Sequence, residues 1–257
     1  VYFVYEDPAT TEIDTISLDD ALPIYTVDMA GDLQTIVTLD NDQPSGLGWL
    51  PDGRLLIVSM TQRKLLVFSD GELGEFADLS GLATFHCNDM VTDSQGRSYV
   101  GNFGFDLHSG SESAKAAMVL VQSDGSTEIA AEGLDFPNGT VITPDGKTLI
   151  VGESFGARLT AFDIQDNGSL TNRRVWAQME GAVPDGICLD EAGGIWVASP
   201  ISNEVLRVVE GGEVTDRISI ENRSDAHTSE LQSRRNLVCR LPLAKTKHLS
   251  TPNPPRT

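Results

Sequence analysis

The stretches SGLGWLPDGRLLIV (45–58), NDMVTDSQGRSYVG (88–101), NGTVITPDGKTLIV (138–151) and DGICLDEAGGIWVA (185–198) repeat one pattern. In each, eight residues separate the first position from an aligned glycine, and successive units lie 43, 50 and 47 residues apart. The pattern is typical of two strands joined by a tight turn at the glycine. Self-similarity at a fixed period indicates a repeat architecture.

Further strand patterns follow each unit, namely KLLVF (64–68), AMVLVQ (117–122), RLTAFDI (158–164) and EVLRVVE (204–210). A unit of roughly 45 residues with several antiparallel strands is typical of a propeller blade. No long stretch has the 3.6-residue apolar period of an amphipathic helix. We therefore predict an all-β fold with four recognisable blades.

The charge balance excludes two classes of partner. The chain has 38 acidic and 18 basic residues, a net charge of −20, which disfavours nucleic acid and anionic membranes. No apolar run approaches the roughly 20 residues that a membrane helix needs. Three cysteines without CxxC spacing argue against a disulfide framework and favour a cytoplasmic location.

The two ends differ in composition from the middle. Residues 1–24 hold six acids and no bases, whereas 223–257 hold two acids and seven bases. ATTEIDTISLDDALPI (9–24) and RSDAHTSELQSRRNLVCRLPL (223–243) resemble translated sequencing-library adapters. We predict a non-native leader (1–24), a propeller fragment (25–222) and a non-native disordered tail (223–257). A natural acidic leader and a natural basic tail are the alternative.

Ser45, Asn88, Asn138 and Asp185 occupy the same position of the four units. The innermost strand of each blade begins near the central channel, so equivalent positions should converge there. Carboxylate, amide and hydroxyl oxygens suit a hard divalent cation such as calcium. The alternative is that these residues are ordinary turn formers before a strand.

Five motifs in order resemble the SMP-30/gluconolactonase/LRE family. They are HCNDMVTDSQGRSYVGNFGF (86–105), FPNG (136–139), TPDGKTLIVGES (143–154), NRRVWA (172–177) and VPDGICLDEAGGIWVA (183–198). The resemblance covers about residues 25–222 and implies a six-bladed β-propeller, of which this chain holds an incomplete part of about four blades. It also implies a metal-dependent hydrolase that opens a sugar lactone or similar cyclic ester.

The resemblance implies roles for particular residues. Asn138 and Asp185 match metal ligands, and Asp185 is also the candidate catalytic general base, since a carboxylate beside bound water can accept its proton. Asn88 matches a residue beside the substrate. The cation is expected to be calcium, with zinc, manganese or magnesium as alternatives.

His86 and Asp89 are the remaining candidates. His86 is predicted to contact the substrate; the alternative is an ordinary core or surface histidine. Asp89 is predicted to orient the Asn88 side chain through a contact outside the site; the alternative is an ordinary turn aspartate. The family's further ligand, a Glu in an EGPxW motif, is not found before residue 25, so this chain as written is expected to bind metal weakly and to be inactive. A non-enzymatic binding module and a different enzyme on the same scaffold stay open, and the sequence leaves the oligomeric state open.

Overall fold

The computed structural model describes residues 2–4, 22–27 and 33–220 of the chain. All regular secondary structure in these ranges is β-strand, and every strand pairing is antiparallel. The predicted all-β class is confirmed. Across the described ranges, no helix has the length and apolarity that a membrane span requires.

Four of the sheets contain four strands each, hydrogen-bonded in sequence order. The first contains β4 (Pro44–Trp49), β5 (Leu55–Ser59), β6 (Lys64–Ser69) and β7 (Glu72–Asp78). The second contains β8 (Cys87–Thr92), β9 (Ser98–Asn102), β10 (Ala116–Val121) and β11 (Thr127–Leu134). The third contains β12 (Pro137–Ile142), β13 (Thr148–Glu153), β14 (Arg158–Ile164) and β15 (Leu170–Gln178). The fourth contains β16 (Ile187–Leu189), β17 (Ile195–Ser199), β18 (Glu204–Val208) and β19 (Val214–Ser219).

The aligned glycines of the repeat close the turn between the first and second strand of each sheet. Their φ angles are +91° at Gly53, +78° at Gly96, +70° at Gly146 and +82° at Gly193. L-residues with a side chain rarely adopt this left-handed region, whereas glycine enters it freely. The turn prediction from the eight-residue spacing is therefore confirmed in all four units.

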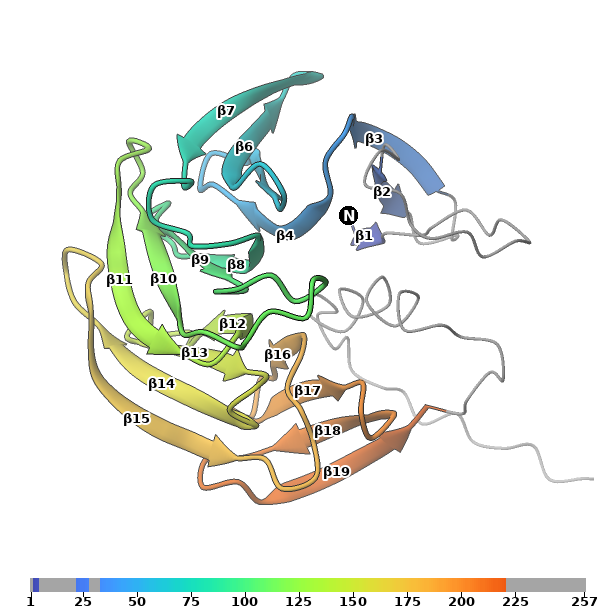
Figure 1. The fold of residues 1–257 in the computed structure, drawn as a ribbon, viewed down its shortest axis with the longest axis vertical. Coiled ribbons are helices and arrows are strands. Elements are labelled where there is room, and N and C mark those ends of the chain that lie inside the picture. The colour runs from blue at the N-terminus through green and yellow to red at the C-terminus, as the bar shows by residue number, and fades with distance from the viewer. Residues whose placement is uncertain (1, 5–21, 28–32, 221–257) are drawn as a thin grey trace, which may run out of the picture.

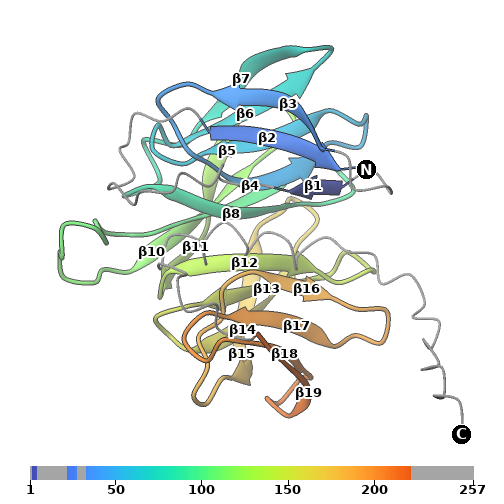
Figure 2. The ribbon, with the colours of Figure 1, turned by 90° about the vertical axis from the view of Figure 1, so that its right-hand side faces the viewer.

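The sheets follow one another around a common centre (Figure 1). The first strands β4, β8, β12 and β16 lie nearest the centre, and the last strands β7, β11, β15 and β19 lie at the periphery. Figure 2 shows the same sheets stacked face to face from the side. The starts of the innermost strands therefore gather near one point.

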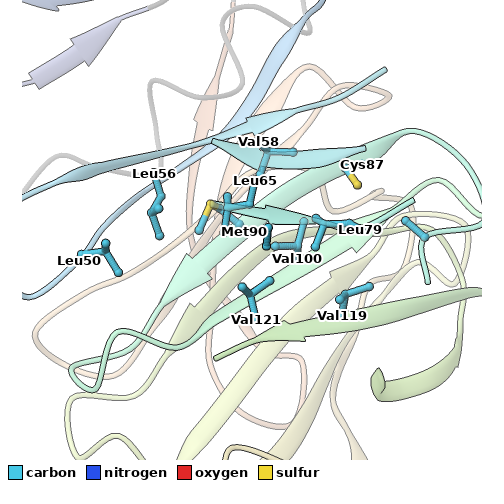
Figure 3. Close-up of a cluster of buried hydrophobic side chains, with 12 residues drawn as sticks. Leu50, Leu56, Val58, Leu65, Leu79, Cys87, Met90, Val100, Val119 and Val121 are labelled. Carbon is cyan, nitrogen blue, oxygen red and sulfur yellow. The ribbon is translucent and has the colours of Figure 1, made fainter. Parts of the chain in front are cut away.

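Apolar side chains between neighbouring sheets form the core. One cluster joins Leu56, Val58 and Leu65 of the first sheet to Val100 and Val119 of the second (Figure 3). Similar clusters lie between the second and third sheets and between the third and fourth. Because most sheets are covered on both faces, their second strands are buried along nearly their whole length and do not alternate between buried and exposed residues.

A fifth sheet of three strands precedes the others: β1 (Tyr2–Val4), β2 (Leu22–Val27) and β3 (Leu33–Leu39). Strand β2 begins at Leu22, so residues 22–24 of the predicted leader belong to a sheet. Ile24 is buried with Leu39 against Leu55 and Ile57 of the next sheet. Most of the leader and the entire 223–257 tail lie outside the described residues, so the predicted division at these ends stays a prediction.

Candidate metal centre

The four aligned residues begin the innermost strands, as the repeat spacing predicts. Ser45, Asn88 and Asn138 are the second residues of β4, β8 and β12, and Asp185 lies two residues before β16. All four are buried, with exposed fractions of 8%, 7%, 8% and 4%. Four polar side chains are thus held out of bulk water near the centre of the molecule.

Hydrogen bonds link these residues from one sheet to the next. The Ser45 hydroxyl donates to the backbone oxygen of Asn88 at 2.9 Å. The Asn88 amide donates to the backbone oxygen of Pro137 at 3.1 Å, and the Asn138 amide donates to Asp185 Oδ1 at 2.5 Å. The predicted ligands Asn138 and Asp185 are therefore in direct contact, with Asn88 one strand away.

Gly139 allows this contact because it brings β12 and the start of β16 unusually close. Its N–H donates to the backbone oxygen of Asp185 at 3.0 Å. A Cβ at position 139 would lie 2.4 Å from the Ile187 nitrogen and 2.5 Å from the Asp185 oxygen. Both atoms are backbone and cannot rotate away, so only glycine fits between the two strands.

Gly139→Ala is expected to lower the free energy of unfolding by about 3 kcal/mol, because the two strands must separate to accept the methyl group. Urea unfolding of both proteins measures this difference. The matched control is Gly81→Ala, where no atom lies within 4 Å of the added Cβ and φ is not positive. The control should change stability by less than about 0.5 kcal/mol. Equal effects of the two substitutions would contradict the close-approach argument.

Ser154, which the sequence analysis missed, supports the same contact. Its hydroxyl accepts a hydrogen bond from the Asn138 amide at 3.2 Å and donates to the backbone oxygen of Pro184 at 2.7 Å. Ser154 thereby connects Asn138 to the residue directly before Asp185. Ser154 ends the motif TPDGKTLIVGES (143–154) but lies outside the aligned position of the repeat, so the repeat comparison did not single it out.

A second set of buried polar residues ends the second strand of every four-stranded sheet: Ser59, Asn102, Glu153 and Ser199. Each is hydrogen-bonded to the segment that leads into the innermost strand, through Asp42, Thr84, Asp135 and Val183 respectively. These contacts hold the segments that carry the aligned residues. The signal was present in the sequence, since each polar residue follows its aligned glycine by six or, in the third unit, seven residues.

His86 and Asp89 flank Asn88. The imidazole of His86 is half-buried and stacks on Phe85 with ring centroids 4.1 Å apart. Burial is the main cause that lowers the pKa of His86, since it disfavours the charged form of the ring. Asp89 is partly exposed and adjoins Asn88 in β8. The substrate contact of His86 and the orienting role of Asp89 stay predictions.

The donors at the centre fit an oxygen-ligated cation in chemical type. One carboxylate and two carboxamides are hard donors, the kind that calcium and magnesium prefer. Rotating the Asn138 amide by 180° would exchange its nitrogen and oxygen and place two oxygens side by side, an arrangement that a cation between them stabilises. Within the described ranges, no group of three or more His, Cys, Asp or Glu residues could hold a metal ion.

Three known proteins are informative relatives. Regucalcin of Danio rerio is 31% identical over 124 residues, which is 47% of this chain and 41% of the relative. A solved gluconolactonase from Xanthomonas campestris is 25% identical, with a TM-score of 0.63 over 75% of this chain and 67% of that one. A solved calcium-binding protein, regucalcin from Agrobacterium tumefaciens, is 20% identical, with a TM-score of 0.64 over 77% and 67% of the two chains.

A family comparison covers more of the chain than any of these. The matched segment of the curated regucalcin is about two fifths of that protein's length. The model of the SMP-30/gluconolactonase/LRE-like region matches residues 20–229, which include all four repeat units and every aligned residue. This chain belongs to the SMP-30/gluconolactonase/LRE-like family.

Proposed function

We propose that this chain is part of a six-bladed β-propeller hydrolase that opens a lactone or a similar cyclic ester with the help of a divalent metal, calcium first among the candidates. The observation that carries the proposal is the 2.5 Å contact between Asn138 and Asp185 at the starts of two neighbouring innermost strands. The names of the relatives, a gluconolactonase and a calcium-binding regucalcin, support the same activity and cation. The proposal concerns the whole protein, and its cytoplasmic location stays a prediction.

The chemistry divides among three residues. A bound divalent cation would polarise the lactone carbonyl and lower the pKa of an attacking water. Asp185 and Asn138 would hold that cation, and the Asp185 carboxylate would also accept the proton of the water. Asn88, one strand away, would place the lactone ring through its amide group. The buried position of these side chains strengthens each electrostatic contact.

The activity is tested with the full-length product of the gene, which includes any ligand upstream of the first described sheet. After treatment with a chelator, hydrolysis of glucono-δ-lactone and of δ-decalactone is measured with calcium, magnesium, manganese and zinc added singly. We expect turnover only when a divalent cation is present. Metal-independent turnover would contradict the metal's role, and binding of lactones without turnover would favour a binding module.

Asn88→Ala in the same protein is expected to raise KM about 10-fold and to change kcat less than about 3-fold, because a neutral amide positions substrate without holding the cation alone. Steady-state kinetics separate the two parameters. The substitution also removes the hydrogen bond to Pro137, so calcium affinity is measured in parallel by isothermal titration calorimetry. A loss of calcium affinity equal to the rise in KM would assign Asn88 to the cation instead.

A further inference from the structure

An aromatic cluster lies beside the candidate metal centre. We call it the aromatic wall, and it comprises Phe85, His86, Phe103, Phe105, Phe136 and Phe155. Phe136 is its hub, with ring centroids 4.6 Å from Phe103, 5.1 Å from Phe155 and 6.1 Å from Phe105. Stacked and tilted rings at these separations attract one another beyond simple burial. The six rings therefore form one continuous surface.

The wall is built from the immediate neighbours of the site residues. Phe136 directly precedes Pro137 and Asn138, and Phe155 directly follows Ser154, which bonds to Asn138. The Ser154 N–H donates to the backbone oxygen of Phe136 at 3.1 Å, which joins these two segments. The rings thus lie at the end of the innermost strands where Asn138 and Asp185 meet.

The backbone of Phe136 is strained in a way that points to function. Its φ is +60°, a region that bulky L-residues rarely adopt and that costs on the order of 1–3 kcal/mol. Strain of this kind persists where the position of a side chain matters, as at ligand-binding sites. The strained residue Phe136 carries the hub ring of the wall and directly precedes Pro137. The backbone oxygen of Pro137 accepts the hydrogen bond from Asn88.

The wall is buried at its base and exposed at its outer end. Phe103 is 1% and Phe136 7% exposed, whereas Phe155 is 56% exposed. Phe105, which contacts Phe155 with centroids 5.6 Å apart, is partly exposed. An exposed ring on a fixed aromatic base offers apolar surface that a ligand can cover without rearranging the protein.

Three polar side chains beside the buried base of the wall, Thr84, Asn102 and Ser154, are engaged within the protein. The Thr84 hydroxyl contacts the Asn102 side chain and the Gly104 backbone oxygen, each at 3.2 Å. The Asn102 amide donates to the Ala117 backbone oxygen at 2.7 Å, and Ser154 donates to Pro184. A sugar hydroxyl group would have to displace an existing hydrogen bond to pair with any of these three side chains, and an unpaired buried hydroxyl group is costly.

We infer that the site takes a lactone with an apolar alkyl or aryl substituent, which packs against Phe155 and Phe105, in preference to a polyhydroxylated sugar lactone. This inference rests on the proposed function for the reaction itself. The preference for an apolar group depends only on the wall, so it can be tested without turnover.

Binding is measured with two non-hydrolysable lactams, 6-pentylpiperidin-2-one and unsubstituted piperidin-2-one, by isothermal titration calorimetry on this chain. The pentyl lactam should bind at least about 10-fold more tightly. Phe155→Ala should reduce that preference about 5-fold or more. The matched control is Val175→Ala in the outer strand β15, where an equally exposed apolar side chain is removed away from the wall. Equal binding of the two lactams, or equal effects of the two substitutions, would overturn the inference.

Hydrolysis by the full-length gene product separates this inference from the proposed function. The ratio of kcat/KM for δ-decalactone to that for glucono-δ-lactone should exceed about 10 and should fall in Phe155→Ala. A ratio below 1 would overturn the inference while supporting the proposed function. If neither lactone is hydrolysed but the pentyl lactam is still preferred, the proposed function fails and the apolar specificity stands.

Discussion

Asp185→Asn is expected to raise the dissociation constant for calcium at least about 100-fold. Asp185 is the single carboxylate among the four aligned residues, and a cation that exchanges hydration water for protein ligands depends on anionic oxygens for its affinity. Asparagine has nearly the same shape, so the loss reports charge and not packing. Isothermal titration of the full-length gene product with calcium, and then with manganese and zinc, measures this change in affinity.

Two controls make the Asp185 result specific. Glu180→Gln removes an equal charge from an exposed position and should leave calcium affinity within about 2-fold. Thermal unfolding of Asp185→Asn without metal should match that of the unsubstituted chain within a few degrees. Unchanged calcium affinity of Asp185→Asn would remove the metal centre from these residues and weaken the lactonase proposal with it.

The repeat made the fold predictable from sequence because its signals are local. An eight-residue spacing between a polar residue and a glycine fixes a strand, a turn and the next strand, and all of these interact within about 20 residues. The aligned residues therefore lie at the starts of the innermost strands, as expected. The three-stranded sheet of β1, β2 and β3 carries no such unit. The sequence therefore gives no sign that β2 begins at Leu22, inside the predicted leader 1–24.

The parts of the site that were missed depend on contacts between distant residues. Ser154 meets Pro184 from 30 residues away, and Asn88 reaches Pro137 from 49 residues away. The aromatic wall joins rings from 85 to 155, and none of them stands at the aligned position of the repeat, although four lie within the motifs 86–105 and 136–139. Only the packing of neighbouring sheets brings these side chains together, and no local periodicity records it.

Glu153 is the second residue with a large expected effect, and it acts on stability. Its carboxylate is fully buried and accepts hydrogen bonds from Arg158, Thr160, Arg173 and the backbone N–H of Asp135. Burial alone would raise the pKa of Glu153, but the hydrogen bonds from Arg158, Thr160 and Asp135 outweigh it and lower the pKa to about 2. The ionised carboxylate is therefore part of the folded structure.

Glu153→Gln is expected to lower the free energy of unfolding by about 3 to 4 kcal/mol at pH 7, because the pKa falls from 4.5 to about 2 and each unit of pKa difference corresponds to roughly 1.4 kcal/mol. The folded pKa lies below the unfolded value, so this stabilisation is present above about pH 4.5 and is lost as the pH falls toward 2. Urea unfolding from pH 6 to pH 2.5 measures both proteins, with Glu213→Gln at an exposed turn as the control. The difference between the Glu153→Gln variant and the unsubstituted chain should shrink across this interval, whereas the control should follow the unsubstituted chain throughout. If the difference in unfolding free energy between Glu153→Gln and the unsubstituted chain stays constant with pH, Glu153 contributes through packing and neutral hydrogen bonds. The charge of Glu153 would then not be what holds Asp135 and the segment that leads to Asn138.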